Sequence, residues 1–125
     1  MLPKILDGME DWQLDFEWLR IKHFVKDTLS LEKMPDFNQI MMLIGIQELG
    51  ALREDFSKEE KEYLLHIATC RLMSLEGYFK FEKNDEDGWP HWTEIKPFSG
   101  SEEEKEKYLM IMAVSYFDNI ITSQA

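Results

Sequence analysis

The sequence is poor in residues that cross-link or interrupt a chain: it has one cysteine, four prolines and six glycines in 125 residues. A single cysteine excludes an intrachain disulfide, and it also excludes zinc-finger and dithiol redox sites, which need several cysteines at fixed spacing. Cys70 lies among apolar residues in the run ATCRLM. This setting favours a small core residue over a nucleophile.

Long apolar runs are also missing. The longest uncharged segment, 37–47, is far shorter than the ~20 residues that a membrane-spanning helix needs. The first residues contain no apolar stretch of signal-peptide length. We therefore expect a cytoplasmic protein that makes no use of a membrane.

Basic residues are few, and they do not cluster. The chain has 14 Lys and Arg against 25 Asp and Glu, which gives a net charge of −11. Binding to nucleic acid or to anionic lipid needs grouped Lys and Arg, so neither is expected. The acid excess is spread over both halves of the chain, and it leaves a basic protein partner open.

Against these absences, the chain shows strong helical periodicity and 13% aromatic residues, which indicates a folded domain. We expect four helices, over about 11–30, 36–52, 58–78 and 102–121. The first carries two adjacent apolar stripes at helical spacing, one with Trp12, Phe16 and Leu19 and the other with Leu14, Trp18, Ile21, Val25 and Leu29. Acids precede bases along this helix, an order that suits the helix dipole.

The second expected helix is apolar on every face, since its run IMMLIGI has no charge, and this pattern predicts a buried helix. Gly45 costs about 1 kcal/mol relative to Ala in a helix interior. We expect a close approach by a neighbouring helix at this position. Gly50 is expected to begin the unwinding of the helix at its C-terminal end.

Two capping boxes open the third and fourth helices. Ser57 precedes Glu60 by three residues, and Ser101 precedes Glu104 by the same spacing. In each box the Ser and Glu side chains satisfy each other's backbone N–H groups. These are the clearest local signals in the chain.

The segment 79–100 joins the last two helices and is expected to be a long loop or a small β-hairpin. Alternating residues flank its polar tip, as in YFKFE and WTEIK. The fold class is therefore all-α: a single domain, 1–125, that forms an antiparallel four-helix bundle with this loop or hairpin between its third and fourth helices.

The polar tip resembles a calcium loop only in part. If Gly88 is placed at the sixth position of an EF-hand loop, two aspartates and Glu94 fall on ligand positions. Lys83 then occupies the first position, where a carboxylate is required, and Pro90 stands at the eighth position, which normally donates a backbone hydrogen bond. We therefore exclude calcium binding by this loop.

Two carboxylate–histidine pairs are the weak candidates for a metal or small-molecule site. His23 and Asp27 share one face of the first helix, and Glu62 and His66 share one face of the third. Together they offer four ligands of a kind that transition metals accept. Surface pairs at this spacing are common without any metal, so we expect no metal and no cofactor.

No motif for nucleophilic catalysis or phosphate binding is present, and we predict no catalytic residues. A non-enzymatic role in protein–protein contact is favoured, with another protein or a second copy of the chain as a homodimer. The alternatives are an acidic inhibitor or immunity-type protein for a basic enzyme, and a bundle with a metal or small-molecule site. The candidate binding surface is an aromatic clasp in the connector, Trp89, Pro90, His91 and Trp92, because Trp is favoured at interface hot spots.

Overall fold

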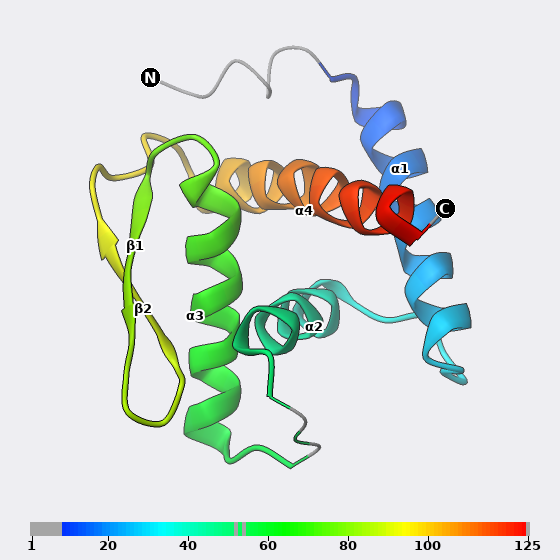
Figure 1. Cartoon of the computed structure of the whole chain (residues 1–125). Helices are drawn as coiled ribbons and strands as arrows, with labels where there is room; N and C mark the ends of the chain where they lie inside the picture. The colour runs from blue at the N-terminus through cyan, green and yellow to red at the C-terminus, as the bar shows by residue number, and fades with distance from the viewer. Residues whose placement is uncertain (1–8, 52, 54, 125) are drawn as a thin grey trace. The chain divides into compact units, whose positions relative to one another are not determined.

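The computed structural model describes residues 9–51, 53 and 55–124. The described chain contains four helices and one two-stranded antiparallel hairpin, which lies between the third and fourth helices (Figure 1). The bounds of the elements are α1 Asp11–Thr28, α2 Phe37–Leu49, α3 Lys58–Ser74, β1 Phe79–Asn84, β2 Pro90–Glu94 and α4 Glu102–Gln124. The expectation of a mostly helical protein with a hairpin is confirmed.

The chain forms two compact units. The first contains α1 and α4, and the second contains α2, α3 and the hairpin. The expectation of a single domain over 1–125 stays a prediction.

Helices α1 and α4 of the first unit are joined by two ion pairs. Lys107 Nζ lies 2.8 Å from Asp11 Oδ1, and Arg20 Nη2 lies 2.8 Å from Asp118 Oδ1. The residue further along α1 pairs with the residue further along α4, so the two helices run in the same general direction. The antiparallel relation expected between the first and last helices of an up-and-down bundle does not hold for this pair, and the assembly of all four helices into one bundle stays a prediction.

The buried face of α1 consists of one of its two apolar stripes. Leu14, Trp18, Ile21 and Val25 are buried. On α4 the buried residues are Tyr108, Leu109, Ile111, Met112, Ala113, Val114 and Phe117. The wide apolar stripe of α4 is thus used for packing, whereas α1 leaves its second stripe in solvent.

The two predicted capping boxes are confirmed. Ser57 Oγ accepts the N–H of Glu60 at 3.1 Å, and Glu60 Oε1 accepts the N–H of Ser57 at 2.9 Å. Ser101 and Glu104 make the same reciprocal bonds, at 3.1 and 3.0 Å. The start of α3 and the start of α4 are therefore fixed by local side-chain chemistry.

Three helices end earlier than their periodicity predicts, and glycine or a left-handed residue marks each end. Ser30 has φ +54° just after α1, Gly50 has φ +72° just after α2, and Gly77 has φ +80° after α3. The N–H of Tyr78 bonds to the carbonyl of Met73 at 3.1 Å, which closes the end of α3 around Gly77. The unwinding expected at Gly50 is confirmed, whereas the predicted extension of the third helix to 78 is wrong because Gly77 turns the chain into β1.

In the second unit, α2 approaches α3 most closely at Gly45. A Cβ atom built on Gly45 would lie 2.2 Å from the carbonyl oxygen of Leu64 and 2.8 Å from its carbonyl carbon. Only a residue without a side chain allows this separation of the two backbones, so the expected close approach is confirmed. Glu48 and Arg71 add an ion pair of 3.1 Å between the same helices.

The hairpin turn follows from its sequence. Asp85 donates its N–H to the carbonyl of Trp89 at 2.9 Å, and Gly88 donates to the carbonyl of Asp85 at 3.0 Å. Gly88 has φ +88°, as the last residue of a three-residue hairpin loop requires. Further from the turn, the register shifts between Phe81 and Lys83, which leaves Glu82 as a bulge in β1.

Candidate functional site

The predicted clasp packs against one side of α3 through Tyr63. The Tyr63 hydroxyl donates to the carbonyl of Pro90 at 2.9 Å, and the Tyr63 ring lies 5.7 Å from the ring of Trp89 and 6.1 Å from that of His91. Pro90 is buried, and Trp89 is half-buried. Three of the four clasp residues therefore meet at one tyrosine, which the sequence analysis did not single out.

The fourth clasp residue, Trp92, contacts the neighbouring strand. It is opposite Phe81 in β1, and their rings are 5.5 Å apart in an edge-to-face contact. Successive residues of a strand point to opposite faces, so the side chains of His91 and Trp92 point apart, and Trp92 shares its face with buried Pro90. The ring contact of Trp92 is thus made within the hairpin.

Asp85 organises the hairpin turn and one clasp side chain. Its Oδ1 accepts the N–H groups of Asp87 and Trp89 at 2.9 and 3.0 Å, and its Oδ2 lies 2.9 Å from Nε2 of His91. The hydrogen bond to His91 is the main cause that lowers the pKa of Asp85, and the Trp89 N–H lowers it further. Both carboxylate oxygens of Asp85 therefore make hydrogen bonds within the hairpin.

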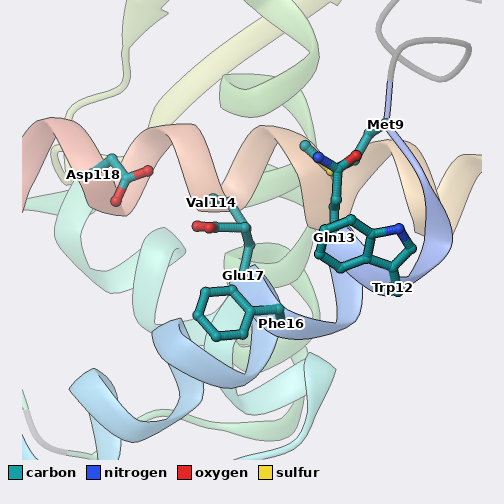
Figure 2. Close-up of a pocket in the computed structure, with 7 residues that line it drawn as sticks. All are labelled: Met9, Trp12, Gln13, Phe16, Glu17, Val114 and Asp118. Atoms are coloured by element: carbon teal, nitrogen blue, oxygen red, sulfur yellow. The ribbon is translucent and has the colours of Figure 1, made fainter.

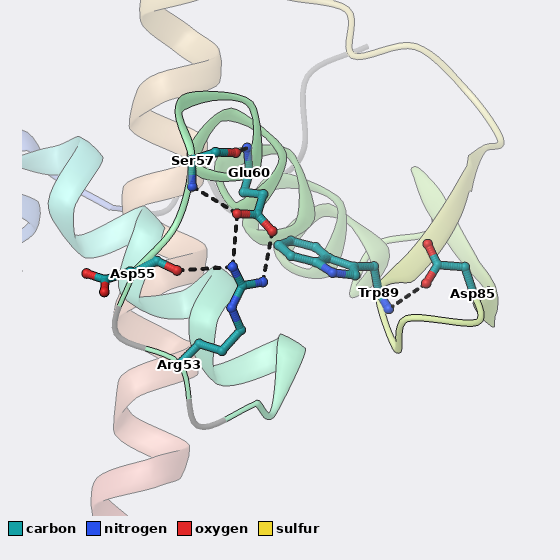
Figure 3. A network of polar contacts seen from close by, with 6 residues as sticks. All are labelled: Arg53, Asp55, Ser57, Glu60, Asp85 and Trp89. Atoms are coloured by element: carbon teal, nitrogen blue, oxygen red, sulfur yellow. Dashed lines mark hydrogen bonds and ion pairs between the residues drawn. The ribbon is translucent and has the colours of Figure 1, made fainter.

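A second polar network holds the segment before α3 beside the turn (Figure 3). Arg53 binds both carboxylate oxygens of Glu60, at 2.8 and 3.0 Å, and also the carbonyl oxygen of Asp55 at 3.1 Å. The guanidinium of Arg53 lies 4.7 Å from the ring centre of Phe56, whose ring in turn meets Trp89 edge-on at 6.3 Å. Arg53 therefore links the N-terminal cap of α3 to the aromatic side of the hairpin.

This network predicts an acid-sensitive step in stability. Arg53 and the Ser57 N–H lower the pKa of Glu60 from 4.5 to about 2. A lowered folded-state pKa stabilises the fold above the unfolded pKa, and this contribution is lost as the pH falls from about 4.5 towards 2. We expect Glu60→Gln to flatten the dependence of the urea midpoint on pH in this window, with Glu59→Gln, its exposed neighbour, as the control. Equal pH profiles for Glu60→Gln and the wild type would contradict the bond to Arg53.

The Tyr63 hydroxyl gives a second prediction. Tyr63→Phe keeps the ring contacts but leaves the carbonyl of buried Pro90 without this donor, at an expected cost of about 1 kcal/mol in the free energy of unfolding. Hydrogen exchange at the amide of Asp85 should become faster as well, because the turn is less firmly held. Thr93→Val, at an exposed position in the same strand as Pro90, should change neither the free energy of unfolding nor the hydrogen exchange of Asp85. An unchanged free energy of unfolding for Tyr63→Phe would show that water replaces the tyrosine hydroxyl at no cost.

Among the described residues, the two most exposed large apolar side chains belong to the second stripe of α1. Trp12, Phe16 and Leu19 have 68%, 64% and 50% of their surface exposed. At 100° per residue this stripe lies about 160° from the buried one, so the two apolar faces of α1 are nearly opposite and not adjacent. One packed neighbour covers one face, and the other face remains in solvent.

A groove runs between this stripe and α4 (Figure 2). It has a volume of about 490 Å³ and is lined by Met9, Trp12, Gln13, Phe16, Glu17, Val114 and Asp118. Arg20 crosses its polar side and bonds both Glu17 and Asp118, with distances of 3.0 Å for Nε to Glu17 and 2.8 Å to Asp118. Both helices thus contribute apolar and polar residues to the groove, and Arg20 joins its two acidic residues, Glu17 of α1 and Asp118 of α4.

The weak metal candidates do not meet in the described structure. His23 and Asp27 lie on α1, and Glu62 and His66 lie on α3. Across residues 9–51, 53 and 55–124, no three His, Cys, Asp or Glu side chains come close enough to hold a metal ion. His66 instead lies 3.4 Å, measured at Nε2, from Sγ of the buried Cys70 one turn along.

Among the described helices, none combines the length and the apolar content needed to cross a bilayer. Comparisons with protein families, characterised proteins and solved structures found no match to this chain.

Proposed function

We propose that this protein is a non-enzymatic binding domain, and that its contact surface is the exposed stripe of α1 formed by Trp12, Phe16 and Leu19. The single observation that carries the proposal is that these three large apolar side chains, at positions i, i+4 and i+7, are each at least half exposed. This spacing is that of the anchors by which a helix docks on a partner. Tryptophan and other aromatic anchors dominate the energetics of protein interfaces.

The size of the stripe supports the proposal. At roughly 200 Å² for each aromatic side chain, Trp12 and Phe16 alone leave about 250 Å² in water. Leu19 brings the area into the range of the largest apolar patch on a typical monomer, about 300–600 Å², which is often functional. The proposal needs only α1 and α4 side by side, and it holds whether or not all four helices form one bundle.

The clasp is the weaker surface. The ring of Trp89 meets those of Tyr63 and Phe56, and the ring of Trp92 meets that of Phe81. These contacts support a structural role in holding the hairpin to α3. Beside the described residues of the first unit, each side chain of the stripe on α1 stays at least half exposed.

Photo-crosslinking tests the surface. A benzophenone amino acid in place of Phe16, introduced in the native cells, should give a discrete protein adduct on illumination. The same group in place of Lys80, exposed on β1, is the control and should give none. The mass of the adduct separates the alternatives: twice the chain mass indicates self-association, and an adduct with a basic enzyme supports the acidic-inhibitor alternative. The absence of a discrete adduct at position 16 would overturn the proposal.

A further inference from the structure

We propose that the partner of the α1 stripe is a second copy of this chain, paired through α1 in antiparallel orientation about a two-fold axis. This inference rests on the proposed function and adds the identity and direction of the partner. Its basis is the charge pattern beside the stripe, which changes sign halfway along the helix.

Four charged residues lie on one side of the stripe when 100° is allowed per residue. The acids Asp11 and Asp15 lie in the first half of α1, and the bases Lys22 and Lys26 lie in the second half. In an antiparallel pair related by a two-fold axis, the side of the stripe that carries these charges meets the same side of the other copy. The two helices run in opposite directions there. Asp15 of one copy then faces Lys22 of the other, and Asp11 faces Lys26.

The apolar stripe has nearly the same centre. The same symmetry places Phe16 opposite Leu19 and Trp12 opposite His23, which is exposed and continues the stripe. The centres of the apolar set and of the charged set differ by one residue, or about 1.5 Å along the axis. A lysine side chain spans this offset easily, so one two-fold axis satisfies both patterns.

The alternative arrangements fit less well. In a parallel pair opposite flanks meet, so Asp15 would face the flank that holds Arg20 and not Lys22. Arg20 is already bonded to Glu17 and Asp118 of its own chain. Within one helix Asp15 and Lys22 are about 10 Å apart along the axis, too far for an ion pair. The order of charges suits the helix dipole, but an ion pair between Asp15 and Lys22 can form only between copies. Asp11 is already bonded to Lys107 of its own chain, so the inner pair carries the argument.

The groove lies on the side of the stripe opposite the four charged residues, so the paired helix would cover only its edge at Trp12 and Phe16. Its volume of about 490 Å³ opens next to Trp12 and Phe16, the same side chains that the two-fold axis brings to the interface. The net charge of −11 opposes association of two copies at low ionic strength. At about 0.15 M salt, charges more than ~8 Å apart are largely screened. Association then depends on the close ion pairs between the copies and on the apolar stripe.

Sedimentation equilibrium of the full chain from about 1 to 200 μM, at 0.15 M salt, tests the inference. We expect the wild type to form a dimer of twice 14.9 kDa. Phe16→Glu should be monomeric throughout this range, and circular dichroism should show an intact fold because Phe16 is exposed. A wild type that stays monomeric at every concentration would overturn the inference.

Charge reversal tests the orientation. Asp15→Lys and Lys22→Asp should each weaken the dimer at least tenfold, and the double variant should recover to within about threefold of the wild type. An equimolar mixture of the two single variants should form a heterodimer, since their flanks are complementary. The controls change the net charge equally away from the stripe: Glu86→Lys matches the first variant and Lys80→Asp matches the second, and both positions are exposed. If the double variant fails to recover, or the controls weaken the dimer equally, the antiparallel pairing is overturned.

The outcomes also separate this inference from the function on which it rests. A monomeric purified chain, together with a crosslink from position 16 to a different protein, overturns the homodimer and leaves the binding surface intact. A monomeric chain with no crosslink from position 16 overturns both.

Discussion

Ile21→Ala is expected to lower the free energy of unfolding by about 2–5 kcal/mol, because the Ile21 side chain is fully buried and its loss leaves a cavity. For a chain of this length the midpoint of thermal unfolding should fall by roughly 8 °C or more. The matched variant is Leu19→Ala, which removes a similar aliphatic side chain two residues away on the same helix. Leu19 is 50% exposed, so its loss should cost about 1 kcal/mol or less.

Both variants are best measured at the lowest practical protein concentration, where association adds little to the apparent stability. The contrast between them tests which of the two apolar faces of α1 belongs to the core. Equal losses would mean that both faces are buried, and the exposed stripe would then be lost as a contact surface.

Gly45→Ala is the second substitution with a large expected effect. Its new Cβ would lie within 3 Å of two backbone atoms of Leu64, so that α2 or α3 would have to shift. Alanine would improve helix propensity by about 1 kcal/mol, but overpacking of a tight contact costs about 1–3 kcal/mol or more. The obstacle is backbone, which cannot rotate away as a side chain can. We therefore expect a net loss near 2 kcal/mol in urea unfolding.

Gly50→Ala serves as the control for Gly45→Ala. Gly50 has nothing within 4 Å of its hypothetical Cβ, and its cost is limited to the strain of a positive φ, about 1–2 kcal/mol. Steric conflict at Gly45 should also scale with size, so Gly45→Val should be worse than Gly45→Ala. Gly45→Ala with wild-type or higher stability would show that the helices do not approach as closely as described.

Local signals in the sequence predicted local structure well. Ser57 and Ser101 mark the starts of α3 and α4 because a capping box is completed within four residues. The hairpin follows from alternating residues and from Gly88, which the turn needs at positive φ. The close approach at Gly45 was also predictable, since a glycine inside a buried helix otherwise only costs stability.

Properties that depend on residues distant in sequence were not predictable in the same way. The bonds from Arg20 to Asp118 and from Lys107 to Asp11 set the direction of α4 along α1, and each joins residues more than 90 positions apart. Hydrophobic spacing revealed both stripes of α1 but not which one a neighbour covers. An angle of about 160° between the stripes was available from the sequence, and it is the signal that one neighbour cannot cover both.

The clasp shows the same limit at a candidate site. Its aromatic residues were identified from composition, yet their partner Tyr63 lies 27 positions away from Pro90. Side chains that are neighbours along a strand point apart, so the clasp that was predicted as one surface is divided, and Trp92 lies opposite Phe81 in β1. The use of the clasp as a binding surface stays a prediction.

The bulge at Glu82 has a consequence for the solubility of the chain. A two-stranded sheet has an open edge on each strand, and an open edge can recruit a strand from another molecule and begin aggregation. In β1 the irregular register at Glu82 bends the strand, and the charged residues Lys80, Glu82 and Lys83 follow one another along it. Both features discourage further strand pairing, so association of the folded chain is directed away from the sheet edge and left to its helices.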